Sequence, residues 1–179
     1  MRTYVFIALL LLSSATVQAQ TKNLKLTNAL VIGQLDKPED KYTLEINLAE
    51  MMAANGIKTM ASLNVLKQGS APEMLASDSI SNVLKAQGID TYVLVSVRGY
   101  DRKFKPATKH DSLATELSTG HLFPLYRDEV VSVTFEFSFY RNGEFIGYDI
   151  VKLGGIGSRD GVLKKFRKRV GKRISKSWK

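Results

Sequence analysis

The sequence contains no cysteine among its 179 residues. This absence excludes disulfide bonds, thiolate metal sites, a cysteine nucleophile and lipid attachment through cysteine. Histidine is scarce as well, since His110 and His121 are the only two imidazoles. Neither a Gly-x-Ser-x-Gly nucleophile motif nor a Gly-Lys-Ser/Thr phosphate loop occurs. The sequence therefore offers no constellation of residues that requires a particular chemistry.

The two histidines allow a chemical interpretation and a plain one. Asp111 follows His110 directly and could orient that imidazole as a general base. Both imidazoles could also bind a metal together with Asp111 or Glu116, although no recognised ligand spacing is present. We therefore expect both histidines to be exposed loop residues.

Long apolar runs are also scarce, and the clearest one, Tyr4–Leu12, lies near the start of the chain. It has only half of the roughly 20 residues that a membrane-spanning helix needs, which disfavours a membrane anchor. A basic residue precedes the run, and Val17 and Ala19 occupy the third-last and last positions before a predicted cleavage site. This pattern is typical of a cleavable signal peptide, residues 1–19. We expect residues 20–179 to be exported as a single domain, periplasmic or secreted, and the lack of cysteine favours a bacterial periplasm.

The order of predicted elements indicates an α/β domain. Residues 24–32, 57–63 and 91–97 have the composition of strands, and helices are predicted from Pro38 to Asn55 and from Ser77 to Gln87. A glycine follows each helix and stops it, and the next strand begins soon afterwards. Strand, helix, strand, helix and strand in succession predict two right-handed crossovers with parallel strand pairing.

A β-hairpin is predicted after this unit. Apolar and polar residues alternate between Glu129 and Tyr140, beginning with Val131 on the apolar face. Asn142-Gly143 is the preferred pair for a two-residue type I′ turn. Counting outward from the turn predicts three pairs on the apolar face: Phe139 with Ile146, Phe137 with Tyr148, and Phe135 with Ile150.

Residues 98–127 form a long polar connection that contains both histidines. Its length exceeds that of ordinary loops, so it is either functional or partly disordered. Aromatic side chains in or near it could contact a partner or could pin the connection to the core. These residues are Tyr100, Phe104, Phe123 and Tyr126.

The last 21 residues carry the whole net charge of the chain. From Arg159 to Lys179 there are ten Lys or Arg residues and one acid, Asp160, which gives +9, the formal charge of the entire chain. The glycine-rich turn before this segment, Gly154–Gly157, lacks the sequence context of a phosphate loop and is expected to be a flexible corner. Ser158 can cap a helix over residues 159–177. Its apolar stripe consists of Val162, Phe166, Val170 and Ile174, extended by Leu163 and Trp178.

Two interpretations of this cationic helix remain open. In one, the stripe packs on the sheet and the charges are merely solvated. In the other, the basic residues contact an anionic surface, which could be lipid headgroups, lipopolysaccharide or an acidic protein. Nucleic acid is disfavoured, because export removes the usual ligand. The candidate contact residues are Lys164, Lys165, Arg167, Lys168, Arg169, Lys172, Arg173 and Lys176.

Three short stretches resemble a group of exported bacterial domains. They are KLTNALVIG in the first strand, the helix–glycine–strand junctions at Gly56 and Gly88, and GIDTYVLV. The group includes the N-terminal domain of TolB, LpoB and CsgG, and the resemblance covers most of the chain after the signal peptide. It implies a non-catalytic domain that contacts other envelope proteins. This chain differs from the lipoprotein members because it lacks the lipid-bearing cysteine.

The sequence thus predicts one α/β domain of two or three layers. We expect a mixed sheet with helices on one face, two βα crossovers, a C-terminal antiparallel hairpin and a basic amphipathic C-terminal helix. The predicted function is that of a non-enzymatic envelope interaction module that needs no cofactor and no metal. A peripheral binder of anionic lipid or lipopolysaccharide is the first alternative, and a small enzyme that uses the 98–127 connection is the second.

Overall fold

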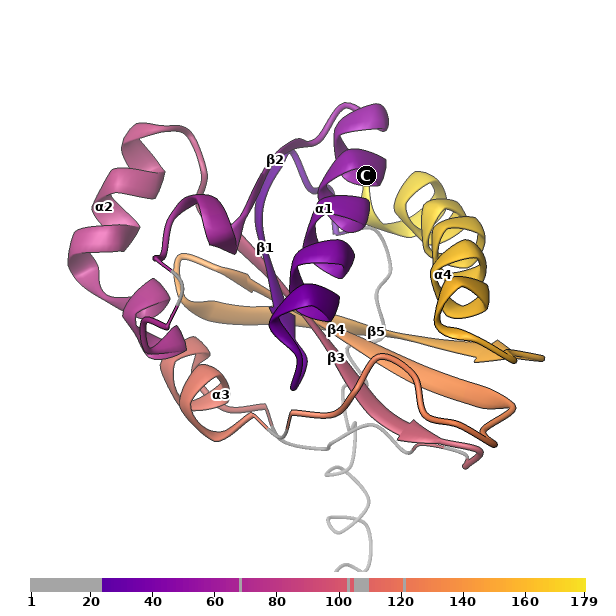
Figure 1. The fold of residues 1–179 in the computed structure, drawn as a ribbon. Helices are drawn as coiled ribbons and strands as arrows, with labels where there is room; N and C mark the ends of the chain where they lie inside the picture. Colours follow the sequence, from indigo (N-terminus) through magenta and orange to yellow (C-terminus); the bar gives the residue numbers. More distant parts are fainter. Residues whose placement is uncertain (1–23, 68, 103, 105–109, 121) are drawn as a thin grey trace, which may run out of the picture.

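The computed structural model describes residues 24–179 except 68, 103, 105–109 and 121, so the predicted signal peptide and His121 lie outside the described residues. It contains a five-stranded mixed sheet with the strand order β2-β1-β3-β4-β5 (Figure 1). Strand β1 pairs in parallel with β2 and β3, whereas β4 pairs antiparallel with β3 and β5. The strands are β1 (Asn28–Gln34), β2 (Lys58–Ala61), β3 (Thr91–Tyr100), β4 (Ser132–Arg141) and β5 (Glu144–Gly154), and the helices are α1 (Pro38–Ala54), α2 (Asp78–Ala86), α3 (Leu113–Thr119) and α4 (Arg159–Arg173).

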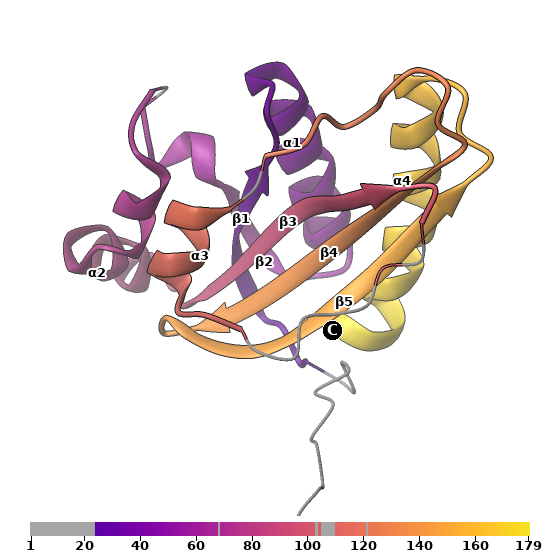
Figure 2. The same ribbon diagram turned by 90° about the horizontal axis from the view of Figure 1, so that it is seen from below.

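Helices cover both faces of the sheet, so the expectation of helices on one face is wrong. Helices α1 and α4 lie side by side on one face, and α2 and α3 lie on the other (Figures 1 and 2). The reason is the composition of the central strands, which are apolar on both sides. Val93 faces α1 and α4, whereas its neighbour Leu94 packs in the second cluster with Leu84 and Leu117. The mixed α/β class, the parallel crossovers and the antiparallel hairpin are confirmed.

The first crossover forms as predicted, although β1 is shifted along the chain. Helix α1 starts at Pro38, and Gly56 follows its end with a φ of 80°. Gly33 lies inside β1 and lets α1 approach closely, since a Cβ there would lie 3.2 Å from Cγ of Lys41. The strand was predicted from residue 24, but Leu24 and Leu26 donate their N–H groups to the carbonyls of the last helical turn instead.

The β4–β5 hairpin is confirmed, but its predicted register is wrong by one residue. The turn residues Asn142 and Gly143 have positive φ values of 52° and 84°, as a type I′ turn requires. Ile146 is then left without a partner, which makes a β-bulge on β5. Val131, predicted on the buried face, is 63% exposed and precedes the strand. The pairs on either side of the bulge are Tyr140 with Phe145 and Phe139 with Gly147, and farther on Phe137 pairs with Asp149 and Phe135 with Val151.

The C-terminal helix packs on the sheet through its whole apolar stripe. Helix α4 continues into a π-helical turn, Ile174–Trp178, and five stripe residues have no exposed surface. The Trp178 ring lies 4.8 Å from that of Phe137, and the Phe166 ring lies 5.1 Å from that of Phe135. The five residues are Val162, Phe166, Val170, Ile174 and Trp178.

Part of the predicted long connection is regular structure. Strand β3 extends to Tyr100, and α3 lies within the segment that was predicted to be a loop. Ser112 caps α3 by accepting a hydrogen bond from the N–H of Thr115 at 3.3 Å. Only Leu113 and Leu117 form its buried face, so the apolar periodicity of α3 is too short to be recognised in the sequence. Within the described part of the chain, no helix is long and apolar enough to span a membrane.

Candidate functional site

The basic residues of α4 and of the turn that follows it fall into three rows, and in two of these rows most members contact other parts of the domain. The first row faces α1. Arg159 Nε lies 2.5 Å from Oδ1 of Asp40. About two helical turns farther along α4, Arg167 NH1 lies 2.5 Å from Oδ1 of Asn47 and 3.3 Å from Oε2 of Glu50. These contacts dock α4 parallel to α1, and they leave the two guanidinium groups with local partners.

The second row faces β5 and the glycine-rich turn. Lys165 Nζ donates to the carbonyls of Gly154 and Gly155 at 2.7 and 2.5 Å. The turn therefore has its carbonyls, not N–H groups, bound by a cation, which is the opposite of a phosphate cradle. Arg173 Nε lies 3.6 Å from Oδ2 of Asp149, which also accepts a hydrogen bond from Trp178 Nε1 at 3.0 Å. Arg169 belongs to the same row by spacing and is exposed.

The third row points away from the sheet. Its members follow the buried stripe by two positions, which is about 200° around an α-helix. All four lysines are exposed, and among the described residues none of them makes a side-chain hydrogen bond or an ion pair. We call this the outward lysine row, and it consists of Lys164, Lys168, Lys172 and Lys176.

The aromatic residues predicted to contact a partner mostly pack on the core. Tyr100, Phe123 and Tyr126 are half-buried against the α1–α4 side, and Phe104 is also half-buried. The Tyr100 hydroxyl donates to the carbonyl of Pro124, and burial raises the pKa of Tyr100 to about 12. These contacts hold the segment after α3 against the domain, which supports the pinning interpretation for three of the four residues.

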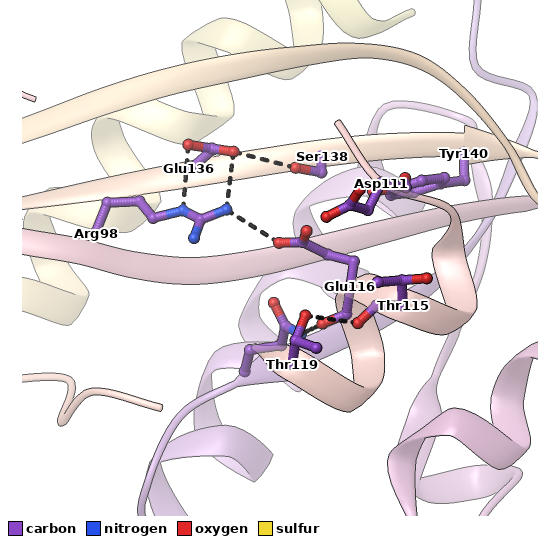
Figure 3. A network of polar contacts seen from close by, with 9 residues as sticks. Arg98, Asp111, Thr115, Glu116, Thr119, Glu136, Ser138 and Tyr140 are labelled. Carbon is purple, nitrogen blue, oxygen red and sulfur yellow. Dashed lines mark hydrogen bonds and ion pairs between the residues drawn. The ribbon is translucent and has the colours of Figure 1, made fainter. Parts of the chain in front are cut away.

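A buried ionic network on the other face of the sheet was missed by sequence reasoning (Figure 3). Arg98 on β3 forms a bidentate pair with Glu136 on β4, at 3.2 Å from Nε to Oε2 and 3.1 Å from NH2 to Oε1. The same NH2 group lies 3.0 Å from Oε1 of Glu116 on α3. Although burial opposes the charge on Arg98, the two carboxylates raise the pKa of its guanidinium. The network therefore fastens α3 to the sheet.

The neighbouring Tyr140 extends this network. Its hydroxyl donates to the carbonyl of Asp111 at 3.3 Å, and burial raises the pKa of Tyr140 strongly, with Glu116 and Glu136 adding to the effect. The sequence contained only a partial signal, since strict alternation in β4 puts Glu136 on its polar face. That face was expected to contact water, but Glu136 is 1% exposed.

His110 is not an exposed loop residue, so that expectation is wrong. Its ring is half-buried and stacks on Phe145 with the centroids 3.9 Å apart and an interplanar angle of 9°. Among the described residues, no group of three His, Asp or Glu side chains is arranged to hold a metal ion. His121 lies outside the described residues.

A surface pocket of about 710 Å³ lies at the carboxyl ends of β1 and β2, where open α/β sheets commonly bind ligands. Its lining is mixed, with apolar Leu35 and Leu63 beside the charged Asp36, Glu39 and Lys41. This mixture points to no single ligand chemistry.

Buried Glu45 contacts two residues that line this pocket, Ser62 and Leu63. Its carboxylate accepts hydrogen bonds from the N–H of Gly33 at 2.8 Å and from the hydroxyl of Ser62 at 2.7 Å, and Leu63 N–H lies 3.4 Å away. Burial nevertheless raises the pKa of Glu45 above its ordinary value of 4.5, and these contacts oppose the effect only in part.

The raised pKa of Glu45 has a measurable consequence for stability. A carboxyl that binds its proton more tightly in the folded state favours folding at low pH, and this contribution is lost as the pH rises through the folded-state pKa. We expect the free energy of unfolding of the wild type, minus that of Glu45→Gln, to fall as the pH rises above 4.5. Urea unfolding of both proteins across this range measures the difference. A constant difference contradicts the prediction.

Comparison with protein-family models and with curated proteins finds no match for this chain. Among solved structures, a PelC dodecamer from Paraburkholderia phytofirmans is 15% identical, covering 88% of this chain and 89% of that chain with a TM-score of 0.47. A PelC variant from the same organism is 13% identical over 88% and 91%, with a TM-score of 0.46. Lipoprotein GNA1162 from Neisseria meningitidis is 13% identical over 84% and 99%, with a TM-score of 0.38. Likenesses this distant carry no functional conclusion, and the resemblance to TolB, LpoB and CsgG stays a prediction.

Proposed function

We propose that this protein is a non-catalytic module of the bacterial cell envelope that attaches to phosphate-bearing headgroups through the outward lysine row. The observation that carries the proposal is the division of the basic residues on α4. Arg159, Lys165, Arg167 and Arg173 have partners within the domain, whereas the outward lysines have none among the described residues. The four like charges on one helix face repel one another, and the helix dipole favours only those in the last turns, Lys172 and Lys176, so folding alone does not explain the whole row.

The attachment is electrostatic and does not involve insertion of the helix. The apolar stripe of α4 is buried in the core of the domain, so it is not available to enter the acyl-chain region of a bilayer. Lysine acts as a hydrated point charge, which suits a surface with many phosphates and no fixed geometry. Each lysine near an anionic membrane contributes about 1 kcal/mol, so the row contributes about 4 kcal/mol, or a thousandfold in partitioning.

The experiment compares two variants with the same net charge. Lys164, Lys168, Lys172 and Lys176 are replaced together by Gln, which has a similar helix propensity. The matched control carries Gln at four other exposed lysines, namely 37, 67, 85 and 152. Both variants of the chain from residue 20 are sedimented with vesicles of neutral lipid, of neutral lipid with phosphatidylglycerol, and of neutral lipid with lipopolysaccharide.

We expect the row variant to lose binding to the anionic vesicles by two to three orders of magnitude, and the control to lose far less. The phosphatidylglycerol and lipopolysaccharide arms tell which source of phosphate is preferred. Equal losses in the two variants would mean that only net charge matters and would refute the assignment of the row. Absence of wild-type binding to both anionic vesicles, together with capture of an acidic protein that depends on the row, would replace the headgroup by a protein partner.

A further inference from the structure

The charges of the domain are unequally distributed between the two ends of the α1–α4 pair. Both helices run in the same direction, because Arg159 contacts Asp40 and Arg167 contacts Glu50. At their amino-terminal end, exposed Asp36, Glu39 and Asp160 are mixed with basic residues. This end also contains the pocket, whose lining includes Asp36 and Glu39.

Exposed lysines predominate at the opposite end, where the acid that contacts Trp178 and Arg173, Asp149, is buried. Lys172 and Lys176 belong to the outward row, and Lys179 is the exposed last residue. Lys25 joins them, because Leu24 N–H donates to Ser177 O at 3.0 Å and Leu26 N–H donates to Trp178 O at 2.7 Å. The beginning of the described chain is thereby fixed beside the end of the chain. We call the end formed by Lys25, Lys172, Lys176 and Lys179 the basic end.

The two ends are far enough apart for an anionic surface to distinguish them. About 20 helical residues separate Asp160 from Lys179, which corresponds to ~30 Å. Charges in solution are screened over about 10 Å at 0.1 M salt. A surface that contacts the basic end therefore acts on those lysines and scarcely on the acids at the other end. Approach by the amino-terminal end gains less attraction, because its acids offset its basic residues.

We propose that the domain meets an anionic bilayer with its basic end, tilted so that the pocket at the carboxyl ends of β1 and β2 faces away from the lipid. This inference rests on the proposed function and specifies the orientation in which the outward lysine row is used. It assigns the basic end as the first contact with phosphate headgroups, brings the rest of the outward lysine row towards them by the tilt, and leaves the pocket accessible from the aqueous side.

The path of the chain agrees with this orientation. Any segment that precedes Leu24 leaves the domain at the basic end, beside Ser177. The apolar run Tyr4–Leu12 lies in that preceding segment. While residues 1–19 are still attached, we expect the apolar run and the lysines to act on the same bilayer. After cleavage, only the salt-sensitive attraction of the lysines keeps this orientation.

The cysteine-free sequence makes the orientation measurable with single labels. Ser175 lies at the basic end, and Asn64 lies after β2 at the pocket end, and both are exposed. Ser175→Cys and Asn64→Cys in the chain from residue 20 are labelled with a fluorophore. They are then bound to phosphatidylglycerol vesicles that contain a lipid with a quencher on its headgroup. Sedimentation of the same samples records how much of each labelled protein is bound.

We expect the label at position 175 to be quenched at least threefold more, per bound molecule, than the label at position 64. Equal quenching, or stronger quenching at position 64, with normal sedimentation overturns this orientation and leaves the proposed function intact. Loss of sedimentation for unlabelled wild type overturns the proposed function and the orientation together. Raising the salt concentration should remove quenching and sedimentation in parallel.

Discussion

The chain without residues 159–179 is expected not to fold. Five side chains of α4 and its final turn have no exposed surface, and they cover the α1 side of β3, β4 and β5. Burial of a large apolar side chain contributes about 1.5–3 kcal/mol, so their loss removes about 8–15 kcal/mol. The whole stability of a domain is only about 5–15 kcal/mol. Circular dichroism and urea unfolding of the truncated chain measure the effect.

A single substitution within this segment gives a graded version of the same test. Trp178→Ala is expected to lower the free energy of unfolding by about 3–5 kcal/mol through the cavity that it leaves. Asp149 also loses the hydrogen bond from Trp178 Nε1. The fourfold Gln variant of the outward lysine row is the control, and its stability should change little because those side chains are exposed. Cooperative unfolding of the truncated chain near the wild-type urea midpoint would show that the stripe is not core.

The second large effect is expected at the ionic network of Arg98. Replacing Arg98 by Met leaves the buried carboxylate of Glu136 without its partner, and breaking a buried pair in this way costs about 3–5 kcal/mol. Glu116 loses a partner as well, but it is more exposed, so it contributes less. The free energy of unfolding in urea is the quantity to compare with wild type.

The double variant Arg98→Met/Glu136→Leu separates the charge effect from packing. Replacing both partners of a buried ion pair by apolar residues is often close to neutral. We therefore expect the double variant to recover most of the stability that Arg98→Met loses. A double variant as unstable as the single one would mean that the network acts through shape and not through charge pairing.

The features that could be predicted from the sequence are those encoded by local chemistry. Pro38 and Gly56 mark the ends of α1, and Asn142-Gly143 fixes the hairpin turn. The four-residue spacing from Val162 to Ile174 identified the apolar stripe of α4, which the structure buries, although the sequence left open whether the stripe packs on the sheet. In each of these cases, a backbone or periodicity requirement is satisfied within a few neighbouring residues.

The features that could not be predicted depend on contacts between distant parts of the chain. The bulge at Ile146 could not be predicted by counting residue pairs outward from the turn, because that counting assumes that every residue of β4 has one partner on β5. Leu24 and Leu26 have the composition of a strand, but their N–H groups pair with a turn near the other end of the chain.

The candidate site was likewise only half visible in the sequence. Spacing alone identified eight basic residues on α4, but it could not tell which of them are neutralised. That distinction depends on acids and carbonyls supplied by α1 and β5, such as Asp40, Glu50 and Gly154. The Arg98 network was not predicted for the same reason, because its three members come from β3, α3 and β4. Among the described residues, tertiary structure thus narrows the eight basic residues to the outward lysine row and Arg169, whose side chains have no partner.

The measurement that tests the central claim most directly is the partitioning of the wild-type chain from residue 20 onto vesicles as salt is raised. The proposed attachment predicts binding to phosphatidylglycerol or lipopolysaccharide vesicles at low salt, little binding to neutral vesicles, and a steep loss of binding between low and high salt. Circular dichroism should stay native throughout. Binding that is equal on neutral and anionic vesicles, or binding that does not respond to salt, contradicts an attachment by the outward lysine row.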